Sequence, residues 1–136
     1  NMGTPNYLIS AAVTLIMAQR LARKSCLDCR VIDENITPKL LNSIGFLPEQ
    51  SSRAKIYKGA GCEECSGTGY RGRMGIYEIL EIDNELKAGI LSNLKQTELN
   101  AIAKKNGFRT MQDMGQDLLL SGDLCFAEYE RVLQSN

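Results

Sequence analysis

The chain has 136 residues, of which 43% are hydrophobic, which is enough for one ordinary domain or two small subdomains with a buried core. Its 16 basic and 16 acidic residues balance, so the composition gives no indication of a polyanionic partner such as a nucleic acid. The chain contains no histidine, which excludes triad and general acid–base chemistry that needs an imidazole. Any metal site must therefore use the thiolates.

The N-terminal region is predicted to form a helix followed by a short strand. Thr4 and Pro5 are a typical helix start, and apolar residues then recur at helical spacing, so we expect a helix over about residues 5–17. Its apolar stripe comprises Leu8, Ala11, Ala12, Leu15 and Ile16. Polar and apolar residues alternate over residues 20–23, which favours a strand that leads into Cys26.

The middle of the chain is predicted to contain a short helix, a loop and a second strand. Thr37 and Pro38 repeat the helix start, and Gly45 supplies a left-handed stop. Residues 48–54 are polar and are predicted to form a mobile loop. Residues 74–80 are rich in strand formers, and we expect this strand to pair antiparallel with the first.

The remainder is predicted to be helical. Asp83 caps a helix over about residues 84–93, the next helix ends at Asn106-Gly107, and a third ends at Ser121-Gly122. The last helix carries Phe126, Tyr129, Val132 and Leu133. Each of these helices has one apolar stripe, so we expect them to pack together as a small bundle.

Four of the five cysteines form two C-x-x-C pairs, Cys26 with Cys29 and Cys62 with Cys65. This is the ligand set of a four-cysteine zinc site, and such a site leaves no open position for water or substrate. We therefore predict that the metal is a structural Zn²⁺ bound by these four thiolates and that it performs no chemistry.

Disulfides are the alternative interpretation of the cysteines, and the C-x-x-C spacing disfavours them. The apolar segment Tyr7–Ala18 follows no basic residue and is too short to span a bilayer, so we find no secretory signal. Thiols that are not exported stay reduced and available to metal. Redox chemistry of a C-x-x-C pair is a further alternative, but it needs one pair at a helix start rather than two facing pairs.

Basic and glycine residues surround the cysteine pairs. Arg20, Arg23, Lys24 and Arg30 are expected to offset the thiolate charge and otherwise to form a solvated face. Residues 67–72 match G-x-G-x-x-G, but they follow a cysteine pair and open a strand-rich segment, so we reject a dinucleotide loop. Instead the glycines should let the chain turn around the metal and point amides at the sulfurs, with Tyr70 packed over the turn. Cys125 is expected to be a buried structural cysteine.

These motifs together resemble the C-terminal part of the secretion and pilus-assembly ATPases, which comprise the type II secretion and type IV pilus extension ATPases. The most specific stretch runs from Cys62 to Glu78. The resemblance covers nearly the whole chain and is carried by Met2-Gly3, Leu8-Ile9, Ala18 to Arg23, Cys26-x-x-Cys29, Cys62-x-x-Cys65-x-Gly67-Thr68-Gly69-Tyr70, Gly72-Arg73, Gly75 to Glu78, Thr97-Glu98-Leu99, Gly107, Thr110-Met111, Gly122 and Glu128-x-x-Arg131-Val132.

The resemblance implies a C-terminal fragment of a cytoplasmic hexameric motor whose ATP and Mg²⁺ sites lie upstream of this chain, so the fragment alone should not be catalytic. The motor would power pilin or pseudopilin assembly, and its partners would be neighbouring subunits and an inner-membrane platform protein, with no nucleic acid. The implied fold is α+β. It comprises the end of a RecA-like sheet (a helix and two antiparallel strands) with a four-cysteine zinc insertion, followed by a small helical bundle.

The expected boundaries divide the chain into four parts. Residues 1–25 complete the RecA-like core, 26–65 form the zinc subdomain, 66–82 form a glycine-rich turn and return strand, and 83–136 form a C-terminal helical subdomain. The family's usual Asp, Lys and threonine positions differ in this chain and hold Met114, Leu118, Leu124 and Cys125. A missing threonine cap weakens the start of the final helix by about 1 kcal/mol.

Two other classes remain as alternatives. Cys62-x-x-Cys65-x-Gly67-x-Gly69 matches the zinc repeat of DnaJ-type co-chaperones, although that class needs several such repeats. A zinc-ribbon nucleic-acid binder would also use two C-x-x-C pairs, but it should be basic, and this chain is neutral.

Overall fold

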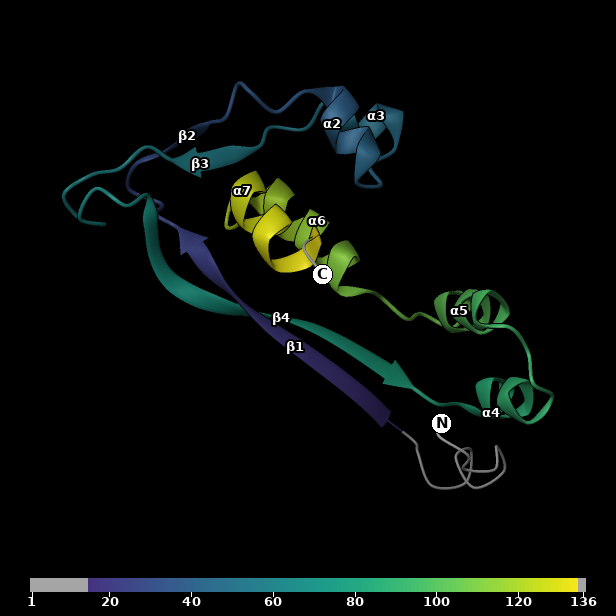
Figure 1. The fold of residues 1–136 in the computed structure, drawn as a ribbon. Helices are drawn as coiled ribbons and strands as arrows, with labels where there is room; N and C mark the ends of the chain where they lie inside the picture. Colours follow the sequence, from purple (N-terminus) through teal and green to yellow (C-terminus); the bar gives the residue numbers. More distant parts are fainter. Residues whose placement is uncertain (1–14, 135–136) are drawn as a thin grey trace. The chain divides into compact units, whose positions relative to one another are not determined.

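The computed structural model describes residues 15–134, which group into two compact units. The first unit contains residues 15–19 with Tyr77–Thr110, and the second contains Arg20–Ile76 with residues 111–134. The elements (Figure 1) are β1 (Leu15–Ser25), β2 (Arg30–Ile32), α2 (Pro38–Ser43), α3 (Pro48–Ser51), β3 (Tyr57–Gly59), β4 (Tyr70–Glu81), α4 (Asn84–Leu91), α5 (Gln96–Lys105), α6 (Met111–Ser121), α7 (Phe126–Tyr129) and a π-helix (Glu130–Gln134). The predicted α+β class is confirmed.

Strands β1 and β4 pair as an antiparallel two-stranded sheet, as the sequence predicts (Figure 1). Strand β1 is longer than expected because it begins at Leu15. The predicted helix is therefore wrong for residues 15–17, and residues 5–14 of that prediction lie outside the described residues. A short apolar run fits helical and strand spacing equally well, and here pairing with β4 decides in favour of the strand.

A second two-stranded sheet lies between the two cysteine pairs and was not predicted. Strands β2 and β3 pair antiparallel, with Arg30 opposite Gly59, Val31 opposite Lys58 and Ile32 opposite Tyr57. Each strand has only three residues, which is too short for a period-two pattern to be recognised. This sheet brings the two cysteine pairs to the same end of the segment that separates them.

The short helices α2 and α3 follow from their first residues. Thr37 accepts a hydrogen bond from the amide of Leu40, and Pro38 occupies the first turn of α2, as predicted. The expected loop over residues 48–54 is wrong at its start, where α3 forms. Pro48 begins that helix, and the Gln50 side chain accepts a hydrogen bond from the backbone amide of Leu47.

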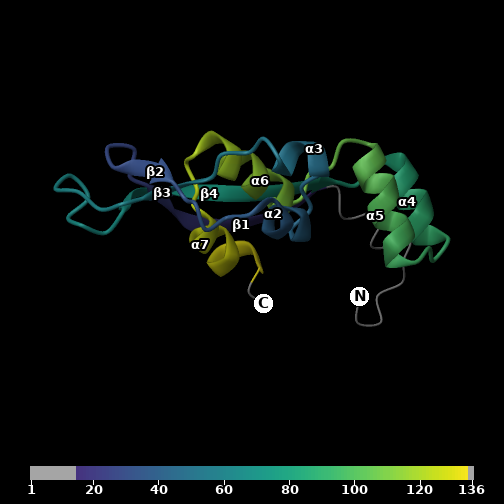
Figure 2. The ribbon, with the colours of Figure 1, turned by 90° about the horizontal axis from the view of Figure 1, so that it is seen from above.

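The core of the first unit lies between α4 and α5, which lie side by side in both ribbon views (Figure 2). Asp83 caps α4 by accepting a hydrogen bond from the amide of Leu86 at 2.8 Å, which confirms the predicted helix start. The buried core comprises Ile82, Leu86 and Ala103, with Leu80, Ile90, Leu99, Ile102 and Phe108 packed against it.

The core of the second unit includes both the C-terminal helices and the segment between the cysteine pairs. Its buried apolar side chains are Ala22, Leu41, Phe46, Ile56, Ile76, Met111, Leu119, Leu124, Phe126, Tyr129, Val132 and Leu133. The helices after Asp83 thus fall into two groups, α4 and α5 in the first unit and α6, α7 and the π-helix in the second, whereas the sequence predicted one bundle. Periodicity identifies an apolar stripe but not the element that covers it. No helix within residues 15–134 is long and apolar enough to cross a membrane.

Two glycines bring the backbone of β3 against the turn that follows Cys65. A Cβ atom added to Gly59 would lie 2.1 Å from the carbonyl oxygen of Gly69, and one added to Gly69 would lie 2.6 Å from that of Gly59. The carbonyl oxygen of Gly69 also accepts the amide of Cys26 at 2.9 Å, so this backbone is held in place. Only glycine fits at this crossing.

We therefore predict that Gly59→Ala destabilises the chain by about 3 kcal/mol, because the added methyl group forces two backbones apart. Gly72→Ala is the matched control, since Gly72 has a φ of +83° but open space around it, and it should lose only about 1 kcal/mol. Chemical denaturation followed by circular dichroism measures both. An equal or smaller loss for Gly59→Ala would contradict the close approach.

Candidate metal centre

The second unit brings the four predicted cysteines together from two separate turns. Cys26 and Cys29 lie between β1 and β2, and Cys62 and Cys65 lie between β3 and β4. Their four sulfur atoms lie within 4.8 Å of one another. Cys26 and Cys65 are buried, while Cys29 and Cys62 are partly exposed. The arrangement could hold one metal ion.

Three of the six distances between sulfur atoms match those of a tetrahedral thiolate site. The Sγ atoms of Cys26 and Cys62 are 3.7 Å apart, those of Cys29 and Cys65 are 3.8 Å apart, and those of Cys62 and Cys65 are 3.7 Å apart. Two sulfurs bound to one tetrahedral zinc ion lie about 3.8 Å apart, because each Zn–S bond is about 2.3 Å long. All five cysteines are free thiols, so no disulfide competes for these sulfurs.

Backbone amides point at the sulfurs, as expected from the glycines beside them. The amides of Cys62 and Gly69 each donate to the Sγ atom of Cys65 at 3.2 Å, and the amide of Gly61 donates to that of Cys29 at 3.2 Å. Burial acts to raise the pKa of Cys65, but the amides of Cys62 and Gly69 and the thiols of Cys62 and Cys29 together outweigh burial and lower that pKa to about 6. Burial raises the pKa of Cys29 to about 12. The two amide donors to Cys65 favour its thiolate form, which is the form that binds metal.

The basic residues around the first cysteine pair make contacts that the sequence did not predict. The Nη1 atom of Arg20 donates to the carbonyl of Val132, and that of Arg30 donates to the carbonyl of Ser121. Lys24 lies 3.9 Å from a carboxylate oxygen of Asp123, and Arg23 binds Glu128. Arg20, Arg23 and Arg30 are exposed and Lys24 is half-exposed, so the predicted solvated face is confirmed, and each of these side chains also contacts the C-terminal part of the chain.

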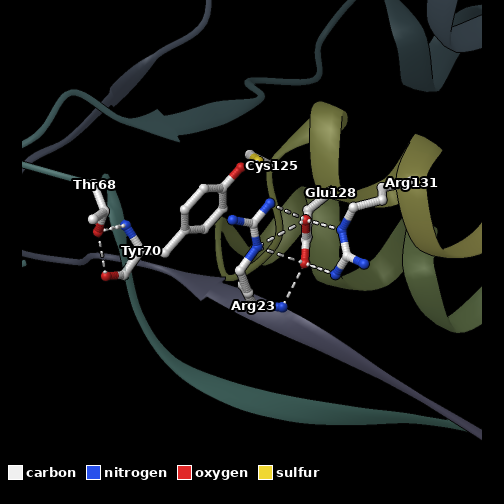
Figure 3. Close-up of polar contacts among 6 residues, drawn as sticks. All are labelled: Arg23, Thr68, Tyr70, Cys125, Glu128 and Arg131. Atoms are coloured by element: carbon white, nitrogen blue, oxygen red, sulfur yellow. Dashed lines mark hydrogen bonds and ion pairs between the residues drawn. The ribbon is translucent and has the colours of Figure 1, made fainter.

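A buried carboxylate is the centre of the polar cluster shown in Figure 3. The side chain of Glu128 has no exposed surface. It accepts the backbone amide of Arg23 at 2.6 Å, the Nη2 of Arg23 at 3.0 Å and the Nε of Arg131 at 2.8 Å. The hydrogen bonds from Arg131, and then those from Arg23, outweigh burial and lower the pKa of Glu128 to about 2. Sequence reasoning did not identify this cluster, although the i, i+3 spacing of Glu128 and Arg131 is a signal that could have done so.

The side chain of Tyr70, which we predicted to pack over the metal turn, contacts Arg23 and Cys125. The guanidinium carbon of Arg23 lies over the Tyr70 ring, 4.1 Å from the ring centre. The Tyr70 hydroxyl and the thiol of Cys125 form a hydrogen bond of 3.4 Å. Cys125 is buried, as expected, and forms no side-chain cap on α7, as its departure from the family pattern implies. Tyr70 therefore joins the metal turn to the C-terminal helix.

A family model described as "Type II/IV secretion system protein" matches residues 1–131. The chain is 37% identical over 121 residues to the type IV pilus assembly ATPase PilB of Thermus thermophilus, which covers 89% of this chain and 14% of that protein. It is 35% identical over 132 residues to PilB of Pseudomonas aeruginosa, covering 97% of this chain and 23% of that protein. It is 31% identical to the type II secretion system protein E of Aeromonas hydrophila, covering 100% of this chain and 26% of that protein.

The chain belongs to the type II/IV secretion system protein family. It spans between 14% and 26% of the length of these family members. The family resemblance inferred from the cysteine and glycine motifs is thus confirmed. The 136 residues contain no G-x-x-x-x-G-K-[ST] phosphate loop.

We predict that Glu128→Gln destabilises this family member by about 3 kcal/mol, because both arginines lose a buried charged partner. Glu130→Gln is the matched control, since it removes the same charge two residues later at an exposed position, and it should change stability by less than about 0.5 kcal/mol. Chemical denaturation at neutral pH compares the two variants. Equal effects would contradict the role of the buried pair.

The same carboxylate predicts a pH dependence. Its pKa in the folded chain, about 2, is below the ordinary value of 4.5, so the unfolded chain binds more protons between these values. The stabilisation is complete above pH 4.5 and is lost as the pH falls towards 2, for a total of about 3 kcal/mol. The difference in unfolding free energy between wild type and Glu128→Gln should shrink over this range. A constant difference would show that Glu128 is not ionised in the folded chain.

Proposed function

We propose that the chain is the C-terminal portion of a hexameric motor ATPase that powers pilin or pseudopilin assembly in type IV pilus biogenesis or type II secretion. In this proposal Cys26, Cys29, Cys62 and Cys65 bind one structural Zn²⁺. The observation that carries the proposal is the cluster of four sulfurs, at tetrahedral separations, in a chain related to proteins named pilus assembly ATPases.

Zinc is the metal that best fits the donor set. Four thiolates in a tetrahedral arrangement are typical of structural zinc, and all four positions are then filled by protein. Three backbone amides donate to the sulfurs, which is the second shell that such thiolates need. When bound, the ion would hold the two turns together, and structural zinc contributes on the order of 10 kcal/mol to folding in small modules.

Residues 1–25 and the return strand within 66–82 would belong to a RecA-like ATPase core, with residues 83–136 as a helical subdomain. In the first unit, Leu15 and Met17 of β1 and Tyr77 and Ile79 of β4 are large apolar side chains that remain 40–64% exposed. The hydrogen bond from Gln19 to the hydroxyl of Tyr77 indicates that the two sets lie on one face. An apolar sheet face of this kind would be covered by the rest of the core in the full-length protein.

The zinc subdomain, residues 26–65, would serve as a docking or subunit-contact element. Its partners would be neighbouring subunits of the hexamer and the inner-membrane platform protein, and the motor would act at the cytoplasmic face of that membrane. ATP and Mg²⁺ would bind only to upstream parts of the full-length protein. The names of the relatives support the motor assignment, and the platform contact follows from the family resemblance.

The purified 136-residue chain should contain one zinc ion per chain and hydrolyse no ATP. Cys62→Ser with Cys65→Ser should abolish zinc binding because only two thiolates remain. Cys125→Ser is the matched control and should retain one zinc, since its sulfur contacts Tyr70 and is not part of the cluster. Metal analysis after removal of loosely bound ions decides the outcome. Absence of zinc, with all cysteines freely titratable in the native chain, would refute the metal centre.

In the full-length protein, Cys62→Ser with Cys65→Ser should weaken capture of the platform protein, because the docking element loses its metal. Cys125→Ser should capture it as the wild type does. A co-purification assay with the platform protein measures both. Unchanged capture by a double variant that is folded and retains ATP hydrolysis would reject a docking role for the zinc subdomain.

A further inference from the structure

We infer that metal binding at the four cysteines is thermodynamically coupled to packing of the C-terminal segment, residues 125–134. The coupling runs through the turn of residues 65–70 and the cluster of Tyr70, Arg23 and Glu128. This inference rests on the proposed zinc site, and every residue in it belongs to the second unit.

The first step leads from the metal ligands to Tyr70. The hydroxyl of Thr68 donates to the carbonyl of Cys65 at 2.7 Å and accepts the amide of Tyr70 at 3.1 Å. The Sγ atom of Cys65 accepts the amide of Gly69, and the amide of Cys26 donates to the carbonyl of Gly69 at 2.9 Å. Two of the four candidate ligands therefore fix the backbone on which Tyr70 sits.

The second step leads from Tyr70 to α7 by two routes, both visible in Figure 3. One route is the hydrogen bond between the Tyr70 hydroxyl and Cys125, which is the residue that precedes α7. The other is the ring of Tyr70, which lies against the guanidinium of Arg23 and so helps to orient its donors towards Glu128. Displacing Tyr70 would disturb both contacts at once.

The third step is the dependence of α7 on these contacts. Glu128 is fully buried, so its charge is tolerated only while Arg23 and Arg131 donate to it. Arg131 lies on the same segment as Glu128, whereas Arg23 belongs to β1 and is the partner of Glu128 that lies outside the segment. Loss of the Arg23 contacts would therefore favour release of residues 125–134.

Coupling of this kind is reciprocal. If the metal favours the packed segment, then a packed segment must strengthen metal binding by the same factor. The expected factor is about 10-fold, within the range usual for coupled sites in one domain. The C-terminal segment would then report on the metal centre although none of its residues is among the four clustered cysteines.

Hydrogen exchange of the 136-residue chain tests one direction. Removal of zinc with a chelator should speed amide exchange in residues 125–134 by about 10-fold. Exchange in α5, which lies in the first unit, should stay unchanged and serves as the internal control. Unchanged exchange in residues 125–134 after complete removal of zinc would overturn the inference.

Zinc affinity tests the other direction. In competition with a chelator of known affinity, Glu128→Gln and Tyr70→Ala should each bind zinc about 10-fold more weakly than wild type, whereas Glu130→Gln should not. Circular dichroism and hydrogen exchange in α2 verify that each variant is folded. If Glu128→Gln unfolds, the zinc affinity of Tyr70→Ala decides whether the coupling exists. The decisive variants are those that stay folded but show faster hydrogen exchange in residues 125–134. If such variants bind zinc within about twofold of wild type, the coupling is overturned and the metal centre stands. A wild-type chain that binds no zinc would instead refute the proposed metal centre, and this inference with it.

Discussion

The convergence of four sulfur atoms within 4.8 Å is the constraint on which the second unit depends. It joins the end of β1 to the turn that precedes β4, and the chain between these points returns through the short sheet of β2 and β3. Glycine at positions 59 and 69 allows the backbones to approach closely enough for this return. The candidate metal site and the local path of the chain thus both follow from the meeting of the two cysteine pairs.

The charged side chains near the cysteine cluster make contacts that the sequence did not predict. Arginines that sequence reasoning placed near the thiolates instead contact the C-terminal helices, and Arg23 does so through a carboxylate with no exposed surface. Burying a charge is unfavourable unless it is paired, so Glu128 makes the position of α7 depend on the position of Arg23. The ion pair therefore holds the end of β1 and residues 125–134 together in the second unit.

Sequence reasoning was most successful where a local signal has one physical outcome. Asp83 and Thr37 cap helices because their oxygens accept an amide three residues later, and the two C-x-x-C pairs identified the four cysteines that cluster. It failed where the outcome depends on distant partners. Leu15 lies in a strand because β4 pairs with β1, and Glu128 is buried because Arg23, more than one hundred residues away, donates to it. Neither partner can be read from the local pattern.

The chain belongs to the type II/IV secretion system protein family, and its second unit brings four cysteines together. The central claim is that the four cysteines bind a structural zinc ion, and X-ray absorption at the zinc edge of the purified chain tests it most directly. The account predicts four sulfur neighbours at about 2.3 Å from the zinc and no nitrogen or oxygen neighbours. A spectrum that requires nitrogen or oxygen ligands, or a purified chain without zinc, would contradict it.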